Sequence, residues 1–424
     1  MRLAPVLLLA GLAGLAGCGG GDGGTTGATT GAGHAIVRVP ADQPTIQGAV
    51  DAARPGDLVL IAPGTYHEAV VVAPRSREIV IRGEDRNRVV LDGRDQLGDG
   101  IAIHADGVAV ENLTVRRYLV NGVVWSPAPD GDASGTEAGE YGGSGSTGAN
   151  QLQGWRGSYL TAADNGLYGV YAFGAEHGRF DHVYASGHPD SGVYVGRCKP
   201  CHALVRDSVA ERNHVGYEAT NASGDVVVRG NRWTRNRVGV QINSLRKEAA
   251  FPQEGSLLSG NTIAANQERD APRGSSGFGA GVVVNGGVGN EVRDNAIRGH
   301  VGVGVVVVDS DDAAAADNTV RANRLSGNRT DLALHARDGR SHGNCFASNR
   351  GAGGAQPSSA PAGLQQRTAR ACGRSVPYGT GTAPLPASPP QVDYRRVPLP
   401  PPQPQMPGAA SAAPRPATGT PERG

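Results

Sequence analysis

One short phrase, a Gly followed by an alternating apolar strand, recurs along this chain at a nearly constant spacing. It is clearest at Gly192-Val-Tyr-Val, Gly216-Tyr-Glu-Ala and Gly239-Val-Gln-Ile, which begin 24 and 23 residues apart. Further copies begin at Gly122, Gly169, Gly281 and Gly304. A fixed period of this length is typical of solenoids, because each copy is too short to bury its own apolar face and must stack on its neighbours.

Each period divides into three short strands separated by turns, as at residues 217–219, 226–228 and around Trp233. Three strands and three turns per repeat predict an all-β fold, a single-stranded parallel β-helix of roughly ten coils. Asn recurs at the turns, and stacked Asn side chains can form hydrogen-bonded ladders. The recurring pairs are Asn231 and Asn236, Asn261 and Asn266, and Asn323 and Asn328.

A helix is predicted over residues 44–53, before the first repeats. Ile46, Ala49, Val50 and Ala53 follow the i, i+3, i+4, i+7 spacing of an amphipathic stripe. The open end of a solenoid needs a cover, so we expect this helix to be an N-terminal cap.

The helix and the strands after it carry a family resemblance. The segments IQGAVDAARPGDLVLIAPGTYHEAVVV and IVIRGEDRNRVVLDG look like the N-terminal part of pectin-lyase-like right-handed β-helix proteins. The resemblance covers about residues 36–350 and implies a right-handed β-helix. That group includes polysaccharide lyases, glycoside hydrolases, uronan epimerases and accessory proteins of periplasmic copper sites. No catalytic motif of these families, such as the Asp-Pro-His of alginate epimerases, is carried over.

The two ends of the chain differ from the repeats. Residues 1–18 read as a secretion signal, and Leu15-Ala16-Gly17-Cys18 resembles a bacterial lipobox. The resemblance implies lipidation of Cys18 and a lipid-anchored position on the extracytoplasmic face of the cell membrane; an ordinary signal peptide cut nearby is the alternative. Residues 19–35 form a Gly/Thr-rich tether. Residues 351–424 hold 16 of the 28 prolines and predict a disordered, partly polyproline tail.

Four further cysteines lie in what would be an oxidising compartment. Proximity in sequence favours disulfides Cys198–Cys201 and Cys345–Cys372 among the three pairings that four thiols allow. Cys198-Lys-Pro-Cys201-His202 also matches the c-type haem pattern, but a turn closed by a local disulfide fits better. Five histidines cluster in this region: His177, His182, His188, His202 and His214. A copper or zinc site is the alternative, since imidazole suits both ions. Scattered surface residues fit the spacing better, so neither a metal nor a cofactor is predicted.

The candidate site follows from strand alternation. Outward positions of consecutive coils form a column that turns polar and aromatic only at Tyr171, Tyr194, Glu218 and Gln241. A second column, two residues before each Gly, holds Asp190, His214 and Arg237. Elongated repeats, with extra residues at 126–150, 244–255 and 268–279, bracket these coils.

This patch has the groups that sugar chemistry requires. Asp190 and Glu218 are predicted as acid and base or nucleophile, and His214 as a proton carrier. Arg237 is predicted to hold a substrate carboxylate. Tyr171, Tyr194 and Gln241 are predicted to bind the sugar rings.

The sequence thus predicts an extracytoplasmic protein that binds and modifies a polysaccharide or cell-wall glycan, as a lyase, hydrolase or epimerase. The alternatives are a non-catalytic scaffold or carbohydrate-binding lipoprotein, or an accessory protein for a copper enzyme. A net charge of +1 gives no reason to expect a nucleic-acid partner.

Overall fold

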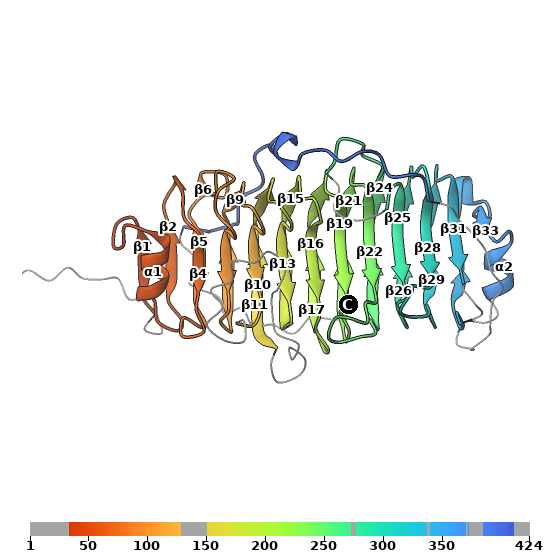
Figure 1. Ribbon diagram of the computed structural model, residues 1–424, viewed down its shortest axis with the longest axis horizontal. Helices are drawn as coiled ribbons and strands as arrows, with labels where there is room; N and C mark the ends of the chain where they lie inside the picture. The colour runs from red at the N-terminus through yellow and green to blue at the C-terminus, as the bar shows by residue number, and fades with distance from the viewer. Residues whose placement is uncertain are drawn as a thin grey trace, which may run out of the picture.

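The structure, a computed structural model, describes residues 34–128, 151–272, 277–336, 340–369, 372 and 385–410. Three parallel sheets wind around one long axis as a solenoid of about 12 turns (Figure 1). The predicted all-β solenoid is confirmed, with about two turns more than expected. The signal segment, Cys18 and most of the tether lie outside the described residues.

Each complete turn contributes one strand to each sheet, and the sheets contain 11, 12 and 10 strands in the described residues. Sheet I contains the strands of the Gly phrase: β4 (Val70–Val72), β7 (Ile101–Ile103), β10 (Val123–Trp125), β13 (Val170–Phe173), β16 (Ser191–Gly196), β19 (Val215–Thr220), β22 (Val238–Asn243), β25 (Ala280–Asn285), β28 (Val303–Val308), β31 (Thr330–His335) and β33 (Ser359–Ala360).

Sheet II contains the strands that follow those of sheet I, together with the first strands of the chain: β1 (Ile36–Val39), β2 (Leu58–Ile61), β5 (Val80–Gly83), β8 (Val108–Glu111), β11 (Leu152–Ser158), β14 (Ala175–Asp181), β17 (Ala203–Arg206), β20 (Val226–Arg229), β23 (Ser256–Ser259), β26 (Glu291–Arg293), β29 (Thr319–Arg321) and β32 (Cys345–Ala347).

Sheet III closes each turn: β3 (Gly64–Tyr66), β6 (Val89–Asp92), β9 (Thr114–Arg116), β12 (Thr161–Ala163), β15 (Tyr184–Ser186), β18 (Val209–Glu211), β21 (Arg232–Thr234), β24 (Thr262–Ala264), β27 (Ala296–Arg298) and β30 (Arg324–Ser326).

The glycine of the repeated phrase is required by contact between successive coils. A Cβ on Gly216 would lie 2.6 Å from the carbonyl oxygen of Gly239 and 2.8 Å from Nδ2 of Asn236. Gly239 meets Gly281 in the same way, with the same 2.6 Å approach. A side chain at these positions would therefore push neighbouring coils apart, which explains why Gly marks the period.

The asparagines form continuous ladders at the turns, as predicted. Asn231 Nδ2 donates to Asn261 Oδ1 at 3.0 Å, and Asn261 Nδ2 donates to Asn295 Oδ1 at 2.9 Å. The same pattern continues through Asn323 and Asn349. Each amide thus satisfies a buried group of the next coil, which an apolar turn residue would leave unpaired.

A second ladder, through Asn213, Asn236 and Asn266, includes two imidazoles in place of amides. His188 Nδ1 lies 2.7 Å from Asn213 Oδ1, and His188 Nε2 lies 3.2 Å from Asn165 Nδ2. His300 occupies the equivalent place between Asn266 and Asn328. Burial lowers the pKa of both histidines to about 4.

Two α-helices lie near the ends of the stack. α1 (Ile46–Ala52) begins after Thr45, whose side chain accepts a hydrogen bond from the N–H of Gly48, and it contacts β1, β2 and β4. Its buried residues, Ile46, Ala49 and Val50, join the main core, so the predicted apolar stripe is confirmed. α2 (Leu364–Thr368) packs against β32, β31 and β33.

Both predicted disulfides are present. Cys198 bonds to Cys201, and Cys345 bonds to Cys372. The first closes the turn between β16 and β17, and the second ties the chain beyond α2 to β32.

Residues 385–410 differ from the solvated, disordered tail that their proline content predicts. This segment runs back along the solenoid towards the N-terminal coils (Figure 1). It includes the short 3₁₀ helix η4 (Tyr394–Arg396); another, η2 (Ala352–Gly354), follows β32. Arg237 donates to the carbonyls of Pro389 and Pro390 at 3.0 and 2.8 Å. Arg86 donates to the carbonyl of Pro404 at 3.0 Å.

The physical reason for this docking is that proline lacks an N–H group but keeps a strong carbonyl acceptor. A proline-rich chain therefore cannot extend a sheet, yet it can accept hydrogen bonds from arginines on the solenoid. Residues 370, 371, 373–384 and 411–424 of the predicted tail lie outside the described part of the chain.

Among the described residues, no helix is both long enough and apolar enough to cross a membrane.

Candidate functional site

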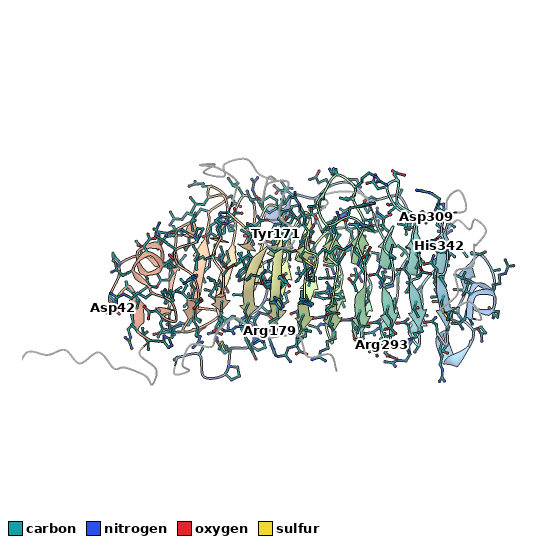
Figure 2. All side chains as sticks on the ribbon, turned by 90° about the horizontal axis from the view of Figure 1, so that it is seen from below. Asp42, Tyr171, Arg179, Arg293, Asp309 and His342 are labelled. Atoms are coloured by element: carbon teal, nitrogen blue, oxygen red, sulfur yellow. A yellow bond between two sulfur atoms is a disulfide. The ribbon has the colours of Figure 1, made fainter. Side chains whose placement is uncertain are left out.

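The outward column predicted for the central coils is present on sheet I. Tyr171 lies opposite Tyr194, Tyr194 opposite Glu218, and Glu218 opposite Gln241. Val124 precedes Tyr171 in this column and Val283 follows Gln241. The neighbouring residues Val193 and Val195 face the core. We call the surface made by Tyr168, Tyr171, Asp190, Tyr194 and Glu218 the sheet I patch; Tyr171 lies near the middle of the long axis (Figure 2).

The aromatic part of the patch is a packed cluster rather than a row of open rings. The ring centroids of Tyr171 and Tyr194 are 4.7 Å apart, and Tyr168 stacks on Tyr171 at 4.4 Å. Phe173 also stacks on Tyr171, with the ring centroids 5.2 Å apart. As a result, Tyr171 and Tyr194 are only 6% and 4% exposed. The sequence predicted open rings; the structure places only Tyr168 partly at the surface.

Sequence reasoning missed Tyr168 and Phe173. Phe173 lies two positions after Tyr171 on β13, so strand alternation places both on the outer face. Applying the alternation rule to the whole strand, rather than to the second residue after each Gly, would have found it. Tyr168 belongs to the turn before β13, where no strand rule applies.

The acidic part of the patch is a pair of carboxyl groups that hydrogen-bond each other, Asp190 and Glu218. Asp190 lies just before β16, and it also hydrogen-bonds the hydroxyl of Tyr168. Oε1 of Glu218 accepts from Asn243 Nδ2 at 2.9 Å, whereas Oε2 is buried and has no protein donor among the described residues. Two carboxylates cannot donate to each other, so this contact requires a proton on one of them.

The electrostatics of the pair agree with a shared proton. Burial raises the pKa of Asp190, and burial together with the nearby Asp190 charge raises the pKa of Glu218 well above its ordinary value. Glu218 is buried, and Asp190 is partly exposed. One buried acid that keeps its proton and one more accessible partner are the elements of general acid–base chemistry.

Arg237 and His214, both predicted to be catalytic, do not belong to the sheet I patch. Arg237 is fully buried, and its three guanidinium nitrogens already donate to Ala271, Arg269, Ser388, Pro389 and Pro390. The structure therefore does not show the predicted clamp for a substrate carboxylate, because the hydrogen bonds of Arg237 are directed partly at the proline-rich segment. His214, in the turn before β19, is fully buried as well.

Gln241 is the one predicted binding residue that keeps an accessible side chain. It lies on β22 and is partly exposed, beside Glu218 in the column. Its amide can donate to and accept from a hydroxyl group at the edge of the patch.

A charged pocket of about 230 Å³ lies on the outer face of sheet II. At its wall Glu111 accepts from Arg82 at 2.8 Å and from Arg156 at 2.9 Å. Arg179 Nε donates to Asp181 Oδ2, two positions along β14, at 2.8 Å in the lining of the same pocket. Strand alternation also points Arg82, Glu111 and Asp181 outward on sheet II, so the rule that finds the column on sheet I finds these residues as well.

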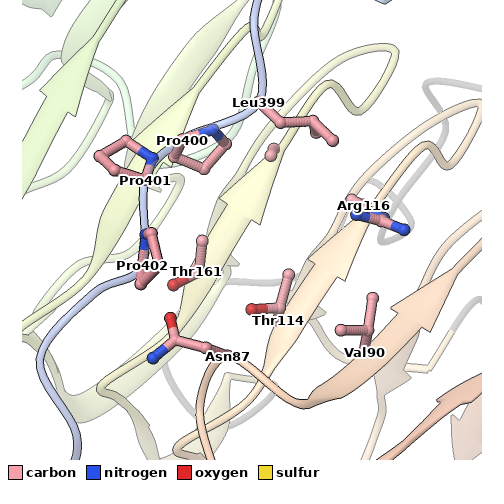
Figure 3. A pocket seen from close by; sticks show the side chains of 10 residues that line it. Asn87, Val90, Thr114, Arg116, Thr161, Leu399, Pro400, Pro401 and Pro402 are labelled. Atoms are coloured by element: carbon pink, nitrogen blue, oxygen red, sulfur yellow. The ribbon is translucent and has the colours of Figure 1, made fainter.

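The proline-rich segment closes a second, smaller pocket of about 150 Å³ on sheet III. Leu399 and the prolines 400–402 form one side, and Asn87, Thr114 and Thr161 form the other (Figure 3). Asn87 Nδ2 donates to the carbonyl of Gln403 at 2.9 Å. This pocket is thus a gap under the segment, without the acid pair found on sheet I.

Comparisons with known proteins agree with this architecture. The family model described as right handed beta helix region matches residues 146–325. The fold is therefore that of the right-handed, pectin-lyase-like β-helix proteins. No curated protein sequence matches the chain.

Several solved structures are similar to this chain at low sequence identity. The N-terminal fragment of gene product 12 from bacteriophage Phi29 is 13% identical, with 74% of this chain and 64% of that chain covered and a TM-score of 0.50. The A-module of the Azotobacter vinelandii mannuronan C-5 epimerase AlgE4 is 16% identical, with 75% and 93% covered and a TM-score of 0.48. A mannuronic acid specific polysaccharide family 6 lyase from human gut microbiota is 16% identical, with 76% and 81% covered and a TM-score of 0.42.

Proposed function

We propose that the sheet I patch binds a polysaccharide and that Asp190 and Glu218 modify it by acid–base catalysis. The observation that carries this proposal is the proton-sharing carboxyl pair beside the tyrosine cluster, on the outside of a solenoid whose neighbouring outward positions are Val. An acid that is buried without a partner destabilises the fold. A buried acid pair with raised pKa values, on the outer face of a sheet, is typical of a functional site.

The spacing of the two acids favours some reactions over others. Glycoside hydrolases hold their two carboxyl groups roughly 5 Å apart or more, to leave room for the sugar or for water. Asp190 and Glu218 hydrogen-bond each other, which requires a closer approach. We therefore favour a lyase or an epimerase. In both, one group removes a proton from a sugar carbon; in a lyase the other group then protonates the glycosidic oxygen as its C–O bond breaks and a C=C bond forms, whereas in an epimerase it returns a proton to the opposite face of the same carbon.

Each residue has a distinct part in this reaction. Asp190, the more accessible acid, takes the proton, while Glu218 supplies one from its buried position. The Tyr168 hydroxyl, bonded to Asp190, orients that carboxylate. The edges of Tyr171 and Tyr194 and the amide of Gln241 contact the sugar. Arg237 and His214 have no role in the proposal, because one is bonded to the proline-rich segment and both are buried.

The test combines product formation with binding on a panel of polyuronates and neutral glycans. Asp190→Asn and Glu218→Gln keep the shapes of the side chains, and we expect each to abolish turnover while the affinity stays within about threefold of wild type. Val283→Ala, in the same column outside the patch, is the control and should change neither. Turnover that survives in both acid variants would exclude the proposed chemistry.

A non-catalytic scaffold is the second candidate, and the burial of Tyr171 and Tyr194 favours it, since packed rings limit access of a sugar to the patch. The same binding and product assays separate the two: product on any member of the panel supports the enzyme, and no product on the whole panel supports the scaffold.

We also propose that the chain is anchored by a lipid at Cys18 outside the cytoplasm, and that α1 covers the open end of the stack. The lipobox-like residues before Cys18 support the first part, and the buried face of α1 supports the second. Cys18→Ser should release the protein from the membrane fraction. Ile46→Asp should lower the unfolding midpoint, because it buries an unpaired charge at the end of the core.

A further inference from the structure

One register position of sheet II, inside the strand in β11 and β14 and just before it in β17, β20 and β23, is left-handed in successive coils, and its occupants change over three of them. The backbone φ is +74° at Gly154, +57° at His177, +44° at His202, +57° at Asp225 and +73° at Gly255. Gly adopts this conformation without strain, whereas a residue with a Cβ does so at some cost. At three consecutive coils, His177, His202 and Asp225 therefore take the place of the glycine that this conformation favours.

These side chains converge with Glu176, the residue before His177 on β14. Potential ligand atoms of Glu176, His177 and His202 all lie within 4.8 Å of one another. Oε1 of Glu176 is 3.4 Å from Nδ1 of His177 and 3.7 Å from Nε2 of His202. The two imidazole rings stack with centroids 4.8 Å apart. All three side chains are partly open to solvent, so an ion can reach them.

Neighbouring residues orient each member of this cluster. The second nitrogen of His202, Nδ1, lies 3.3 Å from Oδ2 of Asp225, which leaves Nε2 directed at Glu176. The second oxygen of Glu176, Oε2, accepts from the amides of Gln151 and Gln153, each at 3.1 Å, which leaves Oε1 directed at the histidines. Metal-binding imidazoles typically have a carboxylate hydrogen-bonded to their second nitrogen, and metal-binding carboxylates are typically hydrogen-bonded at their second oxygen. His202 and Glu176 both have such contacts.

The backbone that carries the cluster is fixed from two sides. The Cys198–Cys201 disulfide closes the turn immediately before His202. The N–H of His177 donates to the carbonyl of Cys201 at 3.0 Å, which joins the two histidine-bearing turns. The cluster is therefore held between adjacent coils before any ion binds.

We propose that Glu176, His177 and His202 bind one divalent transition-metal ion of the zinc–copper class. Two imidazole nitrogens and one carboxylate oxygen suit these ions. Tetrahedral bonds of about 2.0–2.1 Å place ligand atoms roughly 3.3 Å apart, close to the separations of Oε1 from the two imidazole nitrogens. Oε1 of Gln153, 3.3 Å from Nδ1 of His177, is available as a further oxygen ligand.

The bound ion would join two consecutive coils at a point on sheet II, separate from the acid pair on sheet I. The same residues also explain why sequence spacing did not reveal the site. His177 and His202 are 25 positions apart, one full coil, so only the stacking of coils brings them together.

The experiment uses the full chain, without an affinity tag, stripped by chelator and titrated with ZnCl₂ and CuCl₂ in a calorimeter. We expect one ion per chain, and for copper an electron paramagnetic resonance spectrum with splitting from two imidazole nitrogens. Asn tolerates a left-handed backbone, so His177→Asn and His202→Asn remove a ligand without new strain. Each should weaken binding at least about 100-fold, and Asp225→Asn, behind His202, about 10- to 100-fold.

His182→Asn is the matched control. His182 is also left-handed, with a φ of +55°, and is partly exposed, but it stacks on Tyr159 away from the cluster. The His182→Asn variant should bind each metal ion with the affinity and stoichiometry of the wild-type chain. The proposal is overturned if the chain takes up neither ion stoichiometrically, or if the His177→Asn, His202→Asn double variant binds as tightly as wild type.

Discussion

The carboxyl groups of Asp190 and Glu218, which come from successive coils of sheet I, hydrogen-bond each other and so hold a proton between them. The partner of Glu218 in the strand register is Tyr194, so the pair lies against the tyrosine cluster. This relationship has a consequence for stability that does not depend on the substrate.

Glu218→Gln should make stability less dependent on pH. Both carboxyls have raised pKa values, so the folded chain keeps a proton that the unfolded chain releases, and wild-type stability falls as the pH rises above the ordinary carboxyl range. The glutamine amide can donate to Asp190 and removes the need for that proton. Between about pH 5 and pH 8 the unfolding midpoint should therefore fall less in the variant.

Glu291→Gln, at a partly exposed glutamate paired with Arg321, is the control and should follow the wild-type slope. Equal slopes for Glu218→Gln and wild type would show that the pair holds no extra proton.

His188→Asn should make the fold less sensitive to acid. The neutral ring accepts from Asn165 at Nε2 and donates to Asn213 at Nδ1, and protonation would turn Nε2 into a second donor facing an amide donor. The pKa is lowered from 6.5 to about 4, so the folded chain binds fewer protons than the unfolded chain between these values. Wild-type stability is therefore complete above about pH 6.5 and is lost as the pH falls towards 4, by up to about 3 kcal/mol.

Denaturant unfolding at neutral and acidic pH measures this loss. Asn continues the ladder without a titrating group, so the His188→Asn, His300→Asn double variant should lose the least stability on acidification. A loss as large as that of wild type would rule out the two ladder histidines as its source.

Gly216→Ala should be strongly destabilising, by roughly 2–4 kcal/mol, because overpacking displaces neighbouring backbone. The added Cβ would lie 2.6 Å from the Gly239 carbonyl oxygen. Gly98→Ala is the matched control, since a Cβ there has nothing within 4 Å. Similar unfolding midpoints for the two variants would contradict the account of why Gly marks the repeat.

Arg237→Ala should release the proline-rich segment from the central coils. The side chain makes hydrogen bonds to Ser388, Pro389 and Pro390, none of which alanine can replace. Limited proteolysis should then cleave within residues 385–410 at least about tenfold faster, and amide exchange of the non-proline residues there should rise. Arg232→Ala, at an exposed arginine of β21, is the control and should leave the cleavage rate and the amide exchange of residues 385–410 unchanged. Slow cleavage in Arg237→Ala would show that other contacts hold the segment.

Much of the fold could be predicted because the repeat encodes it locally. The spacing of Gly216 and Gly239 reports the contact between coils, and the alternation after each Gly gives the side that faces the core. The Asn ladders and both disulfides followed from the same positions.

The candidate site was predicted only in part, because its chemistry depends on contacts between turns. Tyr194 and Glu218 were placed together correctly, but spacing could not show that the rings would pack on one another. Nor could it show that Arg237, the predicted substrate clamp, would bind a segment more than 150 positions later. Composition alone predicted disorder for that segment, since the carbonyls of its prolines meet their donors only in the folded chain.

The course of the proline-rich segment changes how the solenoid should unfold. In a simple stack each coil contacts only its neighbours, so the ends can fray independently and unfolding spreads coil by coil. Here residues 385–410 contact Arg86 near one end and Arg237 beyond the middle, so coils far apart in the stack share a common partner. A coil between these two points cannot open without loosening a segment that also holds the others. The coils spanned by residues 385–410, from Arg86 to Gly302 beside Pro386, should therefore melt together as one cooperative unit, whereas the coils after β28 are left to melt in steps.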